Sequence, residues 1–143
     1  MKRWVPIALV CCSCATVSES ALIVRDGTVS AGADAAMIQG ASDLAQGLQR
    51  VEQDQLVALA VLNKTSTCEL RAQVAQARAD WQEAFAVVGL AKAVQERLLK
   101  ALKAPSPSRE GVELSIAELN SLLTKVYAEI ESGRKRIAER RSK

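Results

Sequence analysis

The residues with the clearest potential for chemistry are three cysteines near the start of the chain, Cys11, Cys12 and Cys14. A thiolate is both a nucleophile and a metal ligand, so such a cluster can accept an acyl group, bind a metal ion or form disulfides. A zinc or copper site usually has a second group of ligands elsewhere in the chain. The 143 residues include no histidine and only one further cysteine, Cys68. We therefore expect no metal site and no cofactor.

The segment before these cysteines has the pattern of a secretory signal. Two cations, Lys2 and Arg3, precede the apolar run 4–10, and small residues follow it. A cysteine at the end of such a run resembles the modification site of bacterial lipoproteins. In that family a diacylglycerol is attached to the thiol and the chain is cut directly before it. The resemblance covers residues 1–16 and implies a signal peptide over residues 1–13 with a lipid contact to a membrane.

The lipoprotein pattern has a small residue directly before the modified cysteine and leucine, or a similar residue, three positions before it. Cys14 follows Ser13, which fits, although Cys11 stands at the third position. We assign the lipid to Cys14, with Cys12 as the alternative because leucine stands three positions before it. Within the family, Ala15 after the modified cysteine implies delivery to the outer membrane, with the protein facing the periplasm.

Two other interpretations of this segment compete with lipidation. An ordinary signal peptide cut after Ala15 would release an unlipidated periplasmic protein. A permanent membrane helix is disfavoured, because the apolar segment 4–17 has 14 residues and contains Pro6. A helix needs about 20 such residues to span a bilayer.

Length and composition predict one helical domain in the remainder of the chain. Aromatic residues make up only 3% of the sequence, which argues against a β-sheet, whereas abundant alanine suits closely packed helices. Residues 14–32 contain the short apolar run 22–24 and the turn signal Asp26-Gly27, so we expect a lipid-anchored tether there. The bundle then occupies residues 33–143.

The first helix is predicted over about residues 33–62 and the second over 66–103. Asn63 to Thr65 form the turn, and Ser66 to Glu69 has the pattern of a capping box. Apolar residues in both helices step by three and four, as in coiled coils. The first seam comprises Met37, Ala41, Leu44, Leu48, Val51, Gln55, Ala58 and Leu62; the second comprises Leu70, Val74, Ala77, Trp81, Ala84, Val88, Ala91, Gln95, Leu98 and Leu102.

Two prolines in the segment 104–108 end the second helix. A third helix follows over about 108–140, with Ser106, or a capping box from Ser115 to Glu118, as its start signal. Its seam is the most regular and comprises Val112, Ile116, Leu119, Leu123, Val126, Ile130, Gly133 and Ile137.

Three amphipathic helices joined by short loops predict an all-α, antiparallel up-down-up bundle with coiled-coil-like packing, preceded by a flexible tether. The alternative is a helical hairpin that oligomerises, because a seam does not reveal whether its partner lies in the same chain. The sequence therefore leaves open whether the chain forms a homo-oligomer through its helix faces.

The predicted bundle offers little for catalysis. It lacks histidine, phosphate-loop and nucleophile-elbow motifs, and metal-ligand spacing, so we expect no enzyme. Cys68 would be the lone thiol of the folded body in an oxidising compartment. It is either a partly buried free thiol or one half of an intermolecular disulfide.

The C-terminal segment 134–143 is strongly basic. Six cations stand there against one anion, and they are Arg134, Lys135, Arg136, Arg140, Arg141 and Lys143. Cations in the last turns of a helix complement its dipole, which is one interpretation of the cluster. The other is a site for an anionic partner such as lipid headgroups, a cell-wall polymer or an acidic protein face. A nucleic-acid partner is not expected, because no aromatic residues are interleaved with these cations.

Three function classes follow from these patterns. The first is a non-enzymatic outer-membrane lipoprotein that serves as a structural or adaptor element of the cell envelope. The second is a subunit of a larger membrane-associated assembly, including phage-encoded lipoproteins for lysis or superinfection exclusion. The third is a carrier of apolar ligands, which the small residues Ala77, Ala84 and Ala91 disfavour because they predict tight packing.

Overall fold

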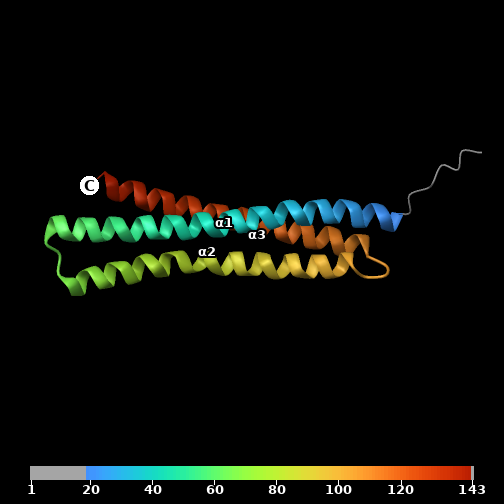
Figure 1. Ribbon diagram of the computed structural model, residues 1–143, viewed down its shortest axis with the longest axis horizontal. Helices are drawn as coiled ribbons and strands as arrows, with labels where there is room; N and C mark the ends of the chain where they lie inside the picture. Colours follow the sequence, from blue (N-terminus) through green and yellow to red (C-terminus); the bar gives the residue numbers. More distant parts are fainter. Residues whose placement is uncertain (1–18, 143) are drawn as a thin grey trace, which may run out of the picture.

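The computed structural model describes residues 19–142, which form three long helices side by side (Figure 1). Helix α1 spans Glu19–Asn63, α2 spans Thr67–Leu102 and α3 spans Arg109–Arg141. Each helix contacts the other two, and this part of the chain contains no strand. The chain runs up, down and up again, so α1 and α3 are parallel and α2 is antiparallel to both. The prediction of an all-α three-helix bundle is confirmed.

The two ends of the described chain lie at opposite ends of the rod (Figure 1). The start of α1 lies near the loop that joins α2 to α3, whereas the end of α3 lies toward the turn between α1 and α2, at the other end of the rod. We call the first the proximal end and the second the distal end. The predicted signal peptide 1–13, the lipidation site Cys14 and its alternative Cys12 lie outside the described residues.

The tether predicted for residues 14–32 is wrong over residues 19–32, which belong to α1. Here Gly27 does not make a turn but lies buried inside the helix. A Cβ atom on Gly27 would meet the methyl groups of Leu102, so the glycine lets α1 approach the end of α2 closely. Ala31, one turn further along, is 2% exposed and belongs to the same small core with Leu98.

The seam predicted for the first helix is only partly correct. Ala41 is buried, but Met37, Val51, Ala58 and Leu62 are exposed. The bundle instead buries a different face of α1, whose apolar members are small or sparse: Ala31, Ile38, Ala41, Ala45, Leu56 and Ala60. The pattern of large apolar residues in α1 therefore marks a face that the bundle leaves largely open.

The seams of the other two helices are correct. Of the α2 seam, Leu70, Val74 and Gln95 are half-buried and the remaining seven residues are buried. All eight residues of the α3 seam are buried or half-buried. In these helices large apolar residues follow a single phase, so the phase alone identifies the interior face.

The helix starts follow local hydrogen bonding. Ser66 caps α2, and its hydroxyl accepts a hydrogen bond from the backbone N–H of Glu69 at 3.2 Å, as the capping box predicts. Ser108 caps α3 by accepting from the N–H of Gly111, so neither Ser106 nor Ser115 is the start signal. The Ser115 hydroxyl instead donates to the backbone carbonyl of Gly111 within the helix.

Gly133 determines how closely α3 packs on α2. The indole ring of Trp81 is fully buried, and a Cβ atom on Gly133 would overlap its Cη2 and Cζ2 atoms. The missing side chain therefore makes the space into which the largest core residue fits. Even a single methyl group at position 133 would occupy the space that the Trp81 ring fills.

We predict that Gly133→Ala destabilises the protein by about 1–3 kcal/mol, because overpacking outweighs the gain in helix propensity. Gly89→Ala is the matched control, since a Cβ atom there meets nothing within 4 Å. The control should be neutral or stabilising by up to about 1 kcal/mol. Urea unfolding followed by circular dichroism measures both, and equal effects of the two changes would contradict the role of Gly133.

Candidate functional site

The predicted basic site divides into two groups. Lys143 lies outside the described residues, and the other five cations occupy the last turns of α3 at the distal end. The side chains of Arg136 and Arg140 are only 26% and 28% exposed, because they turn toward α1. Arg134, Lys135 and Arg141 are exposed to solvent.

The inward arginines meet a carboxylate that has no solvent exposure. Glu52 of α1 is 0% exposed, and its Oε1 lies 2.6 Å from Nη1 of Arg140 and 3.6 Å from Nε of Arg136. Its Oε2 accepts a hydrogen bond from the indole Nε1 of Trp81 at 2.7 Å. Burial of a lone charge is costly, so this carboxylate depends on its partners in α2 and α3.

A second carboxylate completes the cluster. Asp80 of α2 places Oδ2 3.8 Å from Nε of Arg136, and the guanidinium carbon of Arg136 lies 5.4 Å from the centroid of the Trp81 ring. Two carboxylates, Glu52 and Asp80, therefore balance two guanidinium groups, Arg136 and Arg140. We call these four residues and Trp81 the ionic cluster. It joins all three helices near the distal end.

The apolar pattern of α1 does not predict the ionic cluster, because the predicted seam runs through Val51 and Gln55. Glu52 stands seven residues after Ala45, which itself stands seven after Ile38. Both of those residues are buried, so a carboxylate in the same phase is the signal that could have found the site.

The cations exposed to meet an anionic partner are consequently fewer than the six that the sequence suggests. Arg136 and Arg140 are engaged within the protein, and Arg134 lies 3.8 Å from Glu131, one turn before it. Among the described cations of the basic segment 134–143, Lys135 and Arg141 remain without an ion pair. These two and Arg134 are the ones available to a partner.

Cys68 lies in the first turn of α2, also at the distal end, and is a free, exposed thiol rather than a partly buried one. Its exposure leaves it accessible to a second molecule. The intermolecular disulfide therefore stays a prediction.

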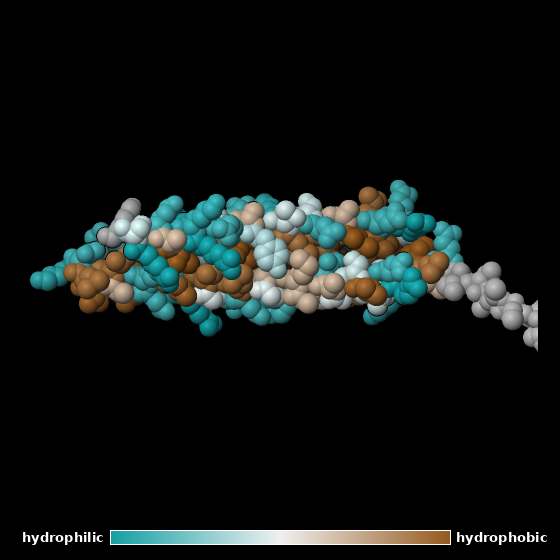
Figure 2. Space-filling model, turned by 90° about the horizontal axis from the view of Figure 1, so that it is seen from above, coloured by the Kyte–Doolittle hydropathy of each residue, from teal (hydrophilic) through white to brown (hydrophobic). Residues whose placement is uncertain are grey.

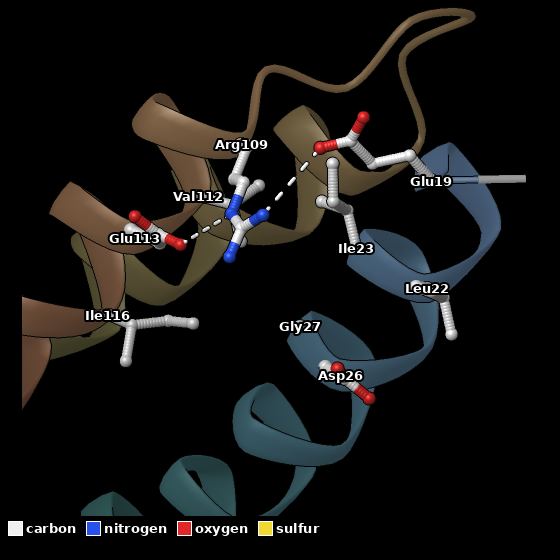
Figure 3. A pocket seen from close by; sticks show the side chains of 9 residues that line it. All are labelled: Glu19, Leu22, Ile23, Asp26, Gly27, Arg109, Val112, Glu113 and Ile116. Carbon is white, nitrogen blue, oxygen red and sulfur yellow. Dashed lines mark hydrogen bonds and ion pairs between the residues drawn. The ribbon is translucent and has the colours of Figure 1, made fainter.

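A shallow groove opens at the proximal end between α1 and α3 (Figure 3). Its volume is about 270 Å³, and its floor is apolar while its rim carries charged side chains. The lining residues are Glu19, Leu22, Ile23, Asp26, Gly27, Arg109, Val112, Glu113 and Ile116.

Arg109 spans this groove between the two helices, as the dashed lines in Figure 3 show. Its Nε lies 2.9 Å from Oε1 of Glu113, and its Nη1 lies 3.6 Å from Oε1 of Glu19. The hydrogen bond that Arg109 donates to Glu113, and then the charges of both carboxylates, raise the pKa of Arg109 above its usual value. All three side chains are well exposed, so this ion pair contributes little to stability.

Within residues 19–142, no three side chains of histidine, cysteine, aspartate or glutamate gather in a way that could hold a metal ion. No helix in the same range is both long and apolar enough to cross a bilayer. Comparison with protein-family models, curated protein sequences and solved structures gives no match to this chain.

We predict that Glu52→Ala destabilises the protein by about 3–5 kcal/mol, because it leaves two guanidinium groups and an indole N–H without their buried partner. Glu52→Gln keeps the side-chain volume and removes only the charge. We expect it to cause a large part of the same destabilisation, so comparing the two variants separates the loss of charge from the creation of a cavity. The control is Glu83→Ala, which removes an exposed ion pair of 3.0 Å with Lys125.

The control should change the free energy of unfolding by less than about 1 kcal/mol. Urea unfolding of the three variants provides the comparison. If Glu52→Ala were as mild as Glu83→Ala, the ionic cluster would not be the link between the helices.

Proposed function

We propose that this chain is a non-enzymatic lipoprotein of the bacterial envelope, acylated on Cys14, whose bundle is a structural or adaptor element at the outer membrane. The observation that supports the proposal most is that helix α1 already includes Glu19. This residue stands only five positions after Cys14, so little chain separates the folded rod from the anchoring residue. The lipid would hold the proximal end of the rod near the membrane surface.

The distal end is then the place for a partner. Helix α1 has 45 residues and is about 67 Å long. Lys135 and Arg141 lie near the far end of this rod, beside the ionic cluster. Exposed cations there suit an anionic cell-wall polymer or an acidic protein surface.

A second candidate is a subunit of a larger membrane-associated assembly, including a phage-encoded one for lysis or superinfection exclusion. The observation that favours it is the exposed apolar face of α1, on which Val29 is 70% exposed and Leu62 is 76% exposed. Exposed apolar surface of this extent is typical of contact with another protein.

The lipid anchor is tested by the intact mass of the protein from the membrane fraction of a bacterial host. We expect a species that lacks residues 1–13 and carries acyl mass, and we expect Cys14→Ser to lose it. Cys12→Ser is the matched control and should keep the acylated species.

An unlipidated chain cut after Ala15 would instead support a free periplasmic bundle. A full-length, uncut chain would refute both the anchor and the export signal. Acylation that is lost in Cys12→Ser and kept in Cys14→Ser would move the site to the alternative cysteine.

The distal cations are tested by co-sedimentation with isolated peptidoglycan sacculi. We expect the double change Lys135→Glu and Arg141→Glu to weaken binding several-fold at low salt, and added salt to reduce the difference by screening. Lys92→Glu on α2 is the control, since this exposed lysine lies outside the basic segment. Equal binding of all three proteins would rule out an electrostatic contact at the distal end.

A further inference from the structure

The outward face of α1 carries an apolar stripe along most of its length. Most of its members follow one another at steps of three or four residues, and all are exposed except the half-buried Leu44. They are Val29, Ala33, Ala36, Met37, Gly40, Leu44, Gly47, Val51, Ala58 and Leu62. Asp54 interrupts the stripe toward its end. A helix with apolar residues on both its inner and its outer face usually contacts neighbours on both sides.

The bundle leaves this stripe uncovered. Cβ atoms on Gly40 and Gly47 would meet nothing within 4 Å, and Met37 and Val51 are 43% and 38% exposed. In Figure 2 apolar surface shows between the hydrophilic side chains along the rod and at both of its ends, including the end that carries the turn between α1 and α2. Val57, Val61 and Leu62 are the exposed large apolar residues of α1 at that end.

We propose that a second copy of this chain packs antiparallel against the stripe, α1 on α1. The charges along one edge of the stripe carry the argument. Asp43 and Arg50 stand seven residues apart, so they occupy the same edge of the helix two turns from each other. In an antiparallel pair related by a twofold axis, each edge of one helix faces the same edge of the other. Asp43 of each copy then lies opposite Arg50 of the other.

This pairing also places the glycine where the helices come closest. The midpoint between positions 43 and 50 falls beside Gly47, so the two copies of Gly47 meet at the twofold axis. A residue without a side chain allows two helix backbones to approach closely. The charge pairing and the small residue therefore agree on one register.

A parallel pair does not satisfy the same charges. In that arrangement the edge with Asp43 and Arg50 would face the opposite edge of the second copy. The positions in phase on that opposite edge are Asp34, Ala41, Leu48, Gln55 and Leu62. Asp34 is the one charged residue among them, and it is 5% exposed and accepts a hydrogen bond from Ser30 of its own helix. Arg50 has no ion pair among residues 19–142, whereas Asp43 accepts a hydrogen bond from Gln39 of its own helix at 2.8 Å. Both are exposed and free to pair across an interface.

The size of the contact sets its strength. In this register residues 30–63 of the two copies overlap, a length of about 50 Å. A strip of that length and roughly 10 Å width buries on the order of 1,000 Å² in total, the lower end for a stable dimer. We therefore expect weak association in dilute solution, strengthened where many copies are confined together. The contact does not depend on the lipid anchor.

Charge exchange tests the proposed interface in the full chain, purified in mild detergent and measured by sedimentation velocity. We expect Arg50→Asp and Asp43→Arg each to weaken dimerisation roughly tenfold or more, because each puts like charges opposite one another twice. The double variant with both changes restores the pairing and should dimerise like the original protein. Circular dichroism confirms that each variant is folded.

Crosslinking locates the axis in the membrane of the bacterial host. With Cys68→Ser as background, we expect Gly47→Cys to form a disulfide-linked dimer upon mild oxidation. The matched control, Gly89→Cys on the exposed face of α2, should not. A monomer at all concentrations, a double charge exchange that fails to restore association, or equal crosslinking at both positions would each overturn the proposal.

Discussion

A carboxylate without solvent exposure needs its charge compensation from inside the protein, and Glu52 obtains it from one residue of α2 and two of α3. The rest of the interior consists mainly of alanine, valine, leucine and isoleucine, whose non-directional apolar contacts leave the helices some freedom to shift along one another. The hydrogen bond from Trp81 and the ion pairs with Arg136 and Arg140 remove that freedom. They fix the position of α1 along the rod relative to both neighbours. A buried polar cluster of this kind sets register at some cost in stability.

The same cluster decides what the basic C-terminal segment can do. Arg136 and Arg140 are drawn to the interior by Glu52, and Gly133 makes this possible by letting α3 lie directly on Trp81. Neighbouring cations on the other side of α3, Lys135 and Arg141, remain in solvent. The basic segment therefore places two arginines against the interior and leaves its other cations in solvent. Its net charge in the sequence overstates what an external partner would meet.

The helix order, the loops and the seams of α2 and α3 were predictable, because large apolar residues there follow one phase. The Ser66 cap of α2 was predictable as well, whereas several serines lie near the start of α3 and the sequence did not single out Ser108. The interior face of α1 was not predictable. Its buried positions hold only two large apolar residues, Ile38 and Leu56, and are otherwise small or polar, whereas Met37, Val51 and Leu62 follow the outward phase. A pattern based on hydrophobicity selects the larger residues and so selects the wrong face. Gly27 was wrongly predicted to mark a turn for a related reason: in the sequence, a glycine that allows close helix packing looks the same as a glycine that makes a turn.

The separation of the chain ends has a mechanical consequence. Because α1 and α3 run in the same direction, a pull between the start of α1 and the end of α3 acts along the rod and loads the helices in shear. All contacts between them must then yield together, whereas a hairpin pulled from adjacent ends opens one contact at a time. The ion pairs from Glu52 to Arg136 and Arg140 lie directly between the two loaded helices. The fold is therefore suited to carry tension from one end to the other without opening.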